Sequence, residues 1–117
     1  MKKIIIAIFL CISLCGCDKN DIKQVINEAY IEKIVLDKEY IILDVRTKEE
    51  YEELHIIDAI NIALNEIDEN IKIDREKIIF VYCKSGNRSN MAYNTLTNLG
   101  YTVYDLGGID SINLEKE

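Results

Sequence analysis

The chain has 117 residues and a formal net charge of −7 at pH 7, and its composition is 49% hydrophobic and 30% charged. This length corresponds to one compact domain, and the apolar content is sufficient for a hydrophobic core. A chain this acidic repels nucleic acid and anionic lipid, which argues against both as binding partners. We therefore expect a single small domain that is monomeric and binds no nucleic acid.

The N-terminus has the pattern of a bacterial export signal. Lys2 and Lys3 precede an apolar run over residues 4–14, which is about half the length that a membrane-spanning helix needs. The run ends in Leu-Cys-Gly-Cys at residues 14–17, which resembles the lipobox of bacterial lipoproteins. The resemblance implies that residues 1–16 are a signal peptide and that Cys17 receives diacylglycerol. We therefore expect an exported protein, anchored through Cys17 to the extracytoplasmic face of the cell membrane.

This interpretation also accounts for the cysteines and the domain boundaries. Of the four cysteines, Cys11 and Cys15 would leave with the signal and Cys17 would become a thioether, so only Cys83 remains a free thiol. A disulfide within one mature molecule is therefore not expected. Loss of Lys2 and Lys3 would change the formal charge from −7 to −9. Residues 17–24 form the lipidated end with a short tether, and residues 25–117 form the domain.

Strand and helix signals alternate along this domain. Residues 40–45 and 77–82 are continuous apolar runs rich in β-branched side chains, typical of strands buried on both faces of a parallel sheet. In chain order, the expected strands are residues 25–26 (an edge strand), 40–45, 59–62 (short), 77–82 and 102–106. Helices are expected from residue 27 to about 36, from 47 through 51, over 64–70 and over 89–99. The alternation predicts an α/β fold, with a central, mostly parallel sheet of about five strands flanked by helices.

Local signals mark the ends of these helices. Asn27 is a suitable N-cap, Thr47 and Glu50 have the spacing of a capping box, and Gly100 is a suitable C-terminal stop. On the last helix, we expect the inward face to contain Met91, Ala92, Thr95, Leu96 and Leu99.

Cys83 directly follows the strongest strand and precedes a helix, at the edge where parallel α/β sheets bind ligands. Gly86 supplies the positive φ that a loop curling around a sulfur requires. Successive backbone N–H groups and the following helix N-terminus then form an anion-binding nest, with Lys84 and Arg88 nearby. These surroundings favour the thiolate and would stabilise a persulfide anion or a bound oxyanion.

Four segments of the chain resemble motifs of single-domain rhodaneses, in the same order, and they span about residues 25–113. The segments are Cys-Lys-Ser-Gly-Asn-Arg-Ser at 83–89, Leu-Asp-Val-Arg at 43–46 with Glu-Tyr at 50–51, Leu-His-Ile-Ile-Asp-Ala-Ile-Asn at 54–61, and Gly-Tyr at 100–101 with Leu-Gly-Gly-Ile at 106–109. Leu54, Ile57 and Asp58 replace the usual glycine, proline and glycine, which predicts a locally altered turn. A tryptophan common in the family after the last motif is missing, and Ile112 or Asn113 occupies that region.

The resemblance implies a rhodanese-like domain that acts as a sulfurtransferase. Cys83 would take a sulfane sulfur from thiosulfate or a related small anionic donor, become a persulfide, and pass the sulfur to a thiol or to cyanide. The loop would cradle this persulfide, and Arg46 would help to hold the donor. The cradle residues are Lys84, Ser85, Gly86, Asn87, Arg88 and Ser89. No cofactor or metal is expected, and His55 and Asp44 are expected to be structural hydrogen-bonding residues.

Several alternatives accompany this hypothesis. Cysteine-dependent phosphatases and arsenate reductases have five residues between cysteine and arginine, whereas four separate Cys83 from Arg88, and Tyr82 stands where such enzymes commonly have histidine. Cys83 as an inert buried thiol is a further alternative, although the polar residues that follow it argue against it. A persulfide carrier that serves a partner protein needs the same loop as the enzyme, so the sequence does not separate these two functions. A purely structural rhodanese-like domain is disfavoured because such domains often lack the cysteine.

Overall fold

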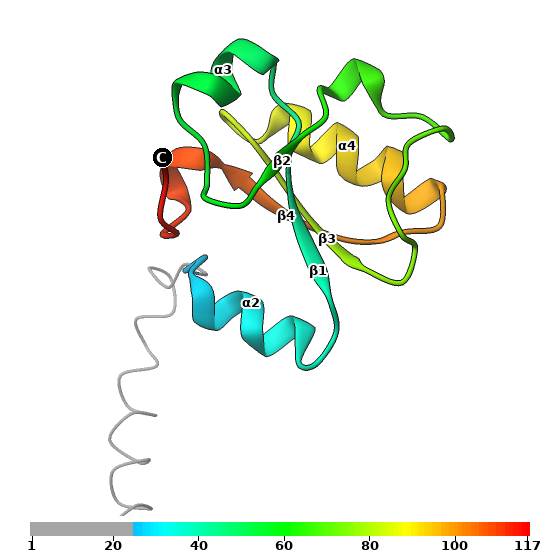
Figure 1. Cartoon of the computed structure of the whole chain (residues 1–117), viewed down its shortest axis with the longest axis horizontal. Coiled ribbons are helices and arrows are strands. Elements are labelled where there is room, and N and C mark those ends of the chain that lie inside the picture. The colour runs from blue at the N-terminus through cyan, green and yellow to red at the C-terminus, as the bar shows by residue number, and fades with distance from the viewer. Residues whose placement is uncertain (1–24) are drawn as a thin grey trace, which may run out of the picture.

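A parallel sheet of four strands organises the structure, a computed structural model that describes residues 25–117 (Figure 1). The strands are β1 (Tyr40–Asp44), β2 (Ile60–Asn61), β3 (Ile78–Cys83) and β4 (Thr102–Gly108), in the order β2-β1-β3-β4. The α/β architecture is therefore confirmed. The expected edge strand at residues 25–26 contributes a single bridge between Ile26 and Ile112.

The expected signal peptide (residues 1–16) and tether (residues 17–24), including the lipidation site Cys17, lie outside the described residues and stay predictions. Within residues 25–117, no helix is long and apolar enough to cross a membrane.

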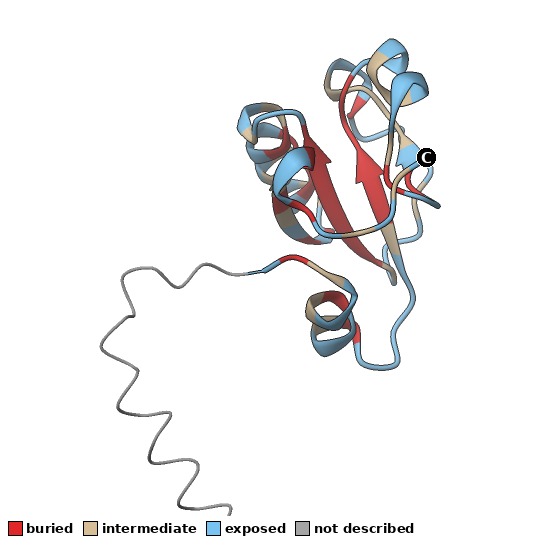
Figure 2. Cartoon of the chain, turned by 90° about the vertical axis from the view of Figure 1, so that its left-hand side faces the viewer, coloured by how far each residue is buried: buried red, intermediate tan, exposed pale blue. Residues whose placement is uncertain are grey.

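Each face of the sheet packs against a helix, which explains why the central strands are apolar throughout (Figure 2). All six residues of β3 are buried, and their side chains alternate between the two faces. Phe80 belongs to the core beneath α2 (Glu28–Val35), whereas Val81 belongs to the core beneath α4 (Asn87–Asn98). Burial on both sides is the arrangement that continuous apolar strands require.

Two helix starts are confirmed by their hydrogen bonds. Asn27 caps α2 by accepting a hydrogen bond from the Tyr30 amide at 3.0 Å. Thr47 and Glu50 form the expected capping box at the start of α3 (Lys48–Glu53). Local sequence chemistry was enough to locate both helix starts, because each cap involves residues only three positions apart.

The structure corrects two local expectations. Residues 64–70 do not form a helix; only the 3₁₀ turn η2 (Leu64–Glu66) is present, and the Asp68 carboxylate accepts a hydrogen bond from the Asn70 amide at 2.8 Å, a local bond that competes with helix formation. On α4, Met91 is 56% exposed, because Ala92 and Leu96, one turn apart, define the buried face. A second 3₁₀ turn, η3 (Ile109–Ser111), follows β4.

Candidate active site

Cys83 is the last residue of β3, and its side chain is completely buried. Its Sγ atom accepts hydrogen bonds from the backbone amides of Gly86, at 3.0 Å, and Ser89, at 3.2 Å. Gly86 is the N-cap of α4 and has a φ of +105°, which turns the chain around the sulfur. The structure thus brings Cys83, Gly86 and Ser89 together in the nest that the sequence predicted.

The nest determines the protonation of the sulfur. Burial raises the pKa of the Cys83 thiol, but hydrogen bonds from the Ser89 hydroxyl and from the amides of Ser89, Gly86 and Ser85 outweigh it, so that the pKa lies below its ordinary value. The Ser89 hydroxyl also lies 3.1 Å from the Gly86 carbonyl oxygen, and with a single proton it can donate to only one of these two partners at a time. The loop therefore favours a thiolate, the nucleophilic form of cysteine.

The remaining loop residues differ in their exposure to solvent. Lys84, Ser85 and Asn87 are exposed, and Arg88 is half-buried. The exposed members of the loop are therefore the ones available to contact a substrate.

Gly108 is a site residue whose role the sequence analysis did not assign. It is paired with Cys83 in the sheet register, and a Cβ atom on it would lie 2.5 Å from the backbone carbonyl oxygen of Lys84. Only glycine lets β4 pass this close to the cysteine loop. The signal was present in the Gly107-Gly108 pair after the strand, but the sequence did not show which segment it would contact.

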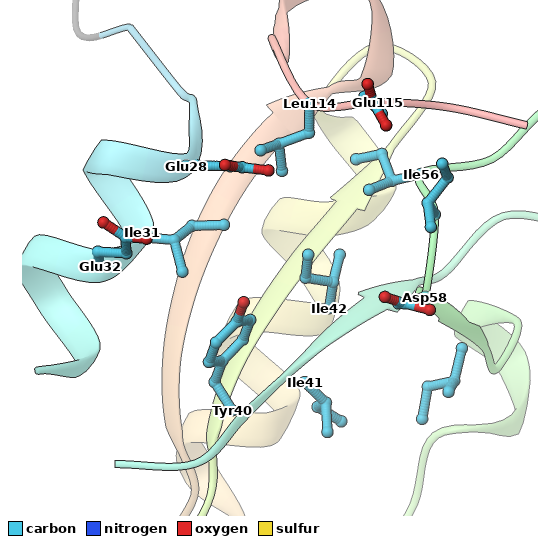
Figure 3. A pocket seen from close by; sticks show the side chains of 12 residues that line it. Glu28, Ile31, Glu32, Tyr40, Ile41, Ile42, Ile56, Asp58, Leu114 and Glu115 are labelled. Carbon is cyan, nitrogen blue, oxygen red and sulfur yellow. The ribbon is translucent and has the colours of Figure 1, made fainter. Parts of the chain in front are cut away.

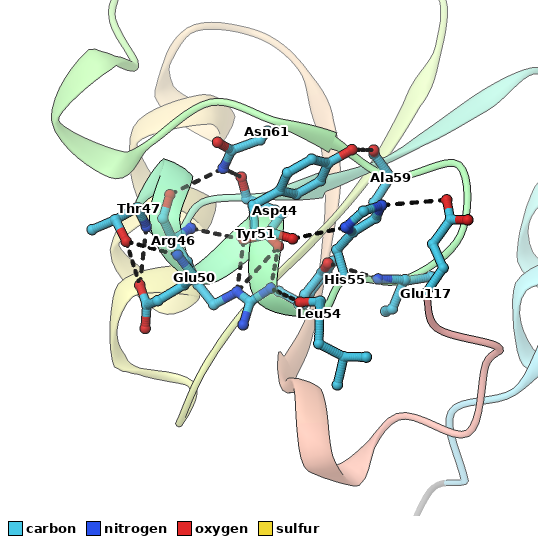
Figure 4. Close-up of polar contacts among 12 residues, drawn as sticks. Asp44, Arg46, Thr47, Glu50, Tyr51, Leu54, His55, Ala59, Asn61 and Glu117 are labelled. Carbon is cyan, nitrogen blue, oxygen red and sulfur yellow. Dashed lines mark hydrogen bonds and ion pairs between the residues drawn. The ribbon is translucent and has the colours of Figure 1, made fainter.

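Glu50 is a second such residue. Its carboxylate accepts two hydrogen bonds from the Arg88 guanidinium, Nη1 to Oε1 at 2.7 Å and Nη2 to Oε2 at 3.1 Å. Thr47 holds the same carboxylate through the capping box (Figure 4). The hydrogen bonds from Arg88 lower the pKa of Glu50 to about 2, and the pKa of Arg88 is raised in turn. The sequence indicated the cap, but not this second partner.

Arg46 lies at the end of β1, where Asp44 binds it. The guanidinium donates to both Asp44 oxygens, with Nη2 to Oδ2 at 2.7 Å, and it also donates to the Leu54 carbonyl at 2.6 Å (Figure 4). Arg46 is only 4% exposed, and Asn61 donates to the backbone carbonyls of both residues. Asp44 is therefore the structural acceptor that we expected. The role of Arg46 in holding a donor stays a prediction, and the contacts that the structure gives it are structural.

His55 also makes structural contacts, as the sequence suggested. Its ring stacks on Tyr51 with 3.9 Å between the ring centroids, and Nδ1 lies 2.7 Å from the Tyr51 carbonyl oxygen (Figure 4). Nε2 lies 3.4 Å from a carboxylate oxygen of Glu117. With both ring nitrogens engaged, His55 fastens the C-terminus to the end of α3.

The segment with the unusual residues keeps a tight turn. The Ala59 amide donates to the Ile56 carbonyl at 3.0 Å, and Asp58 has a φ of +73°. A positive φ at the third residue is typical of a type II turn, where glycine is preferred. Asp58 thus occupies a backbone conformation that suits glycine better.

A pocket of about 640 Å³ lies away from the cysteine loop, between α2 and the start of β1 (Figure 3). Its walls are apolar residues such as Ile31, Ile42 and Ile56, together with four carboxylates from Glu28, Glu32, Asp58 and Glu115. It includes no residue of the loop and no nucleophile, so we do not assign the chemistry to it. Among the described residues, no group of three or more histidine, cysteine, aspartate or glutamate side chains is arranged to hold a metal ion.

The family model for the rhodanese-like domain matches residues 27–115. The chain belongs to the rhodanese-like family. The chain is 38% identical over 78 residues to the thiosulfate sulfurtransferase PspE of Escherichia coli K12, and this match covers 63% of the chain and 75% of the relative. It superimposes on a solved rhodanese with anions from E. coli with a TM-score of 0.62 and 35% identity, over 67% of this chain and 96% of that one.

Other relatives are longer proteins. The chain is 35% identical over 83 residues to the putative sulfur carrier protein YrkF of Bacillus subtilis, covering 70% of the chain and 45% of the relative. It is 38% identical over 95 residues to a probable molybdopterin-synthase adenylyltransferase of Porphyra purpurea, covering 78% of the chain but 24% of that protein. Sulfur transfer at the level of the family is therefore supported, whereas the individual donor and acceptor are not identified.

Proposed function

We propose that this rhodanese transfers a sulfane sulfur from thiosulfate or a related donor to a thiol or cyanide acceptor, through a persulfide on Cys83. The observation that carries the proposal is the pair of backbone amides that point at Sγ, at 3.0 and 3.2 Å. Donors in these positions stabilise a thiolate before the reaction and a persulfide anion after it. No metal or organic cofactor enters the proposal.

The reaction balances in two steps. In the first, the Cys83 thiolate attacks the outer sulfur of thiosulfate; a new S–S bond forms, the old S–S bond breaks, and sulfite leaves with the electron pair. In the second, cyanide attacks the terminal persulfide sulfur; thiocyanate leaves and the thiolate is regenerated. The nucleophile thus divides one transfer into two displacements, with the ping-pong kinetics of covalent catalysis.

The intact mass of the protein tests this proposal. Incubation with thiosulfate should add one sulfur atom at Cys83, and cyanide should remove it with release of thiocyanate. Cys83→Ser should take up no sulfur while keeping its unfolding midpoint near that of the unmodified protein, because serine preserves the shape of the side chain. Uptake by the folded serine variant would contradict the mechanism.

A persulfide carrier is the second candidate, favoured by the similarity to a putative sulfur carrier protein. A carrier would accept sulfur from a polysulfide or protein persulfide and would show no multiple turnover with thiosulfate and cyanide. Steady-state thiocyanate production therefore separates the two functions.

We also propose that the protein is exported and lipid-anchored through Cys17, in keeping with the lipobox-like residues 14–17. Expression in a bacterium should give a mature protein whose first residue is Cys17 carrying diacylglycerol. Cys17→Ala should remain unprocessed, and mass spectrometry of the N-terminal peptide distinguishes the two forms.

A further inference from the structure

The basic residues at the candidate site are less available to an anion than the sequence suggested. Arg46 is paired with Asp44, and Arg88 is paired with Glu50 through two hydrogen bonds. Lys84 is exposed and forms no ion pair with any residue in the described part of the chain. Two of the three positive charges expected to attract a donor are therefore balanced by carboxylates.

Glu50 is the balancing carboxylate next to the cysteine loop. It belongs to α3, whereas Arg88 lies five residues after Cys83 on the first turn of α4. The pair is about one-third exposed, with 34% for the Arg88 side chain and 29% for Glu50, so both charges reach the solvent beside the cysteine loop. Arg88 immediately precedes Ser89, whose backbone amide donates to Cys83 Sγ at 3.2 Å, so the ion pair lies close to the sulfur along the chain.

This arrangement matters most for a doubly charged donor. A dianion that approaches a thiolate is repelled twice as strongly as a monoanion, and it gains twice as much from each uncompensated cation. When Glu50 cancels the charge of Arg88, Lys84 is the cation that remains to offset this repulsion. The acidic surface of the chain adds to it.

We propose that Glu50 selects the sulfur donor: its charge slows sulfur uptake from a dianion such as thiosulfate more than uptake from a monoanionic or uncharged donor. This inference rests on the proposed function, because it assumes sulfur uptake at Cys83. Glu50 is a specificity-determining residue here and does not touch the reacting atoms.

Methanethiosulfonate, CH₃SO₂S⁻, is a suitable probe, because it resembles thiosulfate in shape but carries one charge fewer. The Cys83 thiolate attacks its terminal sulfur, a new S–S bond forms, the old S–S bond breaks, and methanesulfinate leaves with the electron pair. The product is the same Cys83 persulfide, so both donors can be followed by the same gain in mass.

The experiment compares rate constants for sulfur uptake from the two donors in the full chain and in Glu50→Gln. Glutamine at this position still satisfies a capping box and can still accept a hydrogen bond from Arg88, so the substitution removes mainly the charge. Glu49→Gln is the matched control, because Glu49 is an exposed glutamate on the same helical turn. The ratio of the two rate constants cancels any change in the thiolate fraction, since both donors react with the same sulfur.

We expect Glu50→Gln to raise the ratio of the rate constant for thiosulfate to that for methanethiosulfonate by roughly three- to tenfold at low salt. This is the effect expected when one unit charge a few ångströms from the donor is removed. The change in this ratio should be smaller in 1 M salt, where the Debye length is about 3 Å. The control Glu49→Gln should alter the ratio by less than about twofold at low salt.

Three results would overturn the proposal. The ratio could fall, which would mean that Glu50 positions Arg88 to receive the dianion; it could stay constant; or it could change equally in Glu49→Gln, as a general effect of surface charge. Absence of uptake from both donors in the unmodified protein is a different result, because it would overturn the proposed function itself.

Discussion

The carboxyl ends of β1 and β3 lie side by side, and Asp44 is paired with Tyr82 in the sheet register. Each end leads to an arginine bound by a carboxylate. At the end of β1, Arg46 and Asp44 are almost completely buried, with 5% and 0% exposure of their side chains. Beyond the end of β3, Arg88 and Glu50 are partly exposed to solvent, and the amide of the next residue, Ser89, donates to Cys83 Sγ.

The two arginine–carboxylate pairs differ in burial, and this difference gives them different roles. In a buried pair neither charge can take water in place of its partner, so removal of one partner alone is costly. A partly exposed pair contributes little to stability, but its two charges still act on an ion that approaches from the solvent. We therefore expect substitutions at the end of β1 to change the free energy of unfolding, and substitutions near the end of β3 to change mainly the chemistry.

The largest effect on stability is expected for Asp44→Asn. It leaves the Arg46 charge buried without its counter-ion, which should lower the free energy of unfolding by about 3–5 kcal/mol in urea denaturation. Asp37→Asn, at an exposed position, is the control and should change it by less than about 0.5 kcal/mol.

If Asp44→Asn does not fold, the double variant Asp44→Asn with Arg46→Met tests whether the unpaired buried charge is the cause. Removal of both charges should recover much of the loss. A loss below about 1 kcal/mol in the single variant would contradict the structural role of the buried pair.

A smaller effect is expected where β4 supports the cysteine loop. Gly108→Ala should cost about 1–3 kcal/mol, because the added Cβ meets backbone that has to shift. The same shift displaces Lys84 and should slow sulfur uptake. Gly107→Ala is the matched control: it meets no atom within 4 Å, so that only its φ of +85° opposes the substitution, at about 1 kcal/mol. Equal rates of uptake in the two variants would show that contact with the loop does not matter.

The contribution of the Glu50–Arg88 pair to the free energy of unfolding should depend on pH. The pKa of Glu50 is lowered from 4.5 to about 2, so its stabilising contribution is complete above about pH 4.5 and is lost as the pH falls toward 2. The unmodified protein should therefore exceed Glu50→Gln in stability at neutral pH, by at most about 1 kcal/mol for so exposed a pair. Urea denaturation from pH 6 to pH 2 measures the difference, and a gap that widens toward low pH would contradict the pairing.

The smallest effect is expected at the turn after His55. Asp58→Gly should raise the free energy of unfolding by about 0.5 kcal/mol, because relief of the left-handed conformation is partly offset by the larger entropy of glycine in the unfolded chain. Asp37→Gly, at a position without a positive φ, should give no such gain. A loss in Asp58→Gly would mean that the carboxylate stabilises the turn by a contact of its own.

Much of the site was readable because it is local in the chain. The sulfur of Cys83 and the amides that bind it lie within six residues, and Gly86 is the one residue of that loop free to adopt a positive φ without strain. The caps of α2 and α3 are equally local. The apolar runs of β1 and β3 indicated burial on both faces, because a strand with one face in solvent alternates apolar and polar residues.

Other features depended on how the elements pack. Glu50 and Arg88 are 38 residues apart, and only the packing of α3 beside the cysteine loop brings them together. Gly108 supports that loop because β4 is the strand next to β3, which its sequence does not reveal. Met91 faces outward because the sheet determines which side of α4 is covered.

The sequence alone predicted the loop around Cys83 and the type of fold, since these follow from backbone chemistry over a few residues and from the period of apolar side chains. The role of Cys83 as nucleophile stays a proposal. The tertiary structure decided which of the nearby charges remain available to a substrate. The physical reason is that an ion pair between distant segments depends on distances of a few ångströms, and those distances are fixed only when the helices have packed on the sheet.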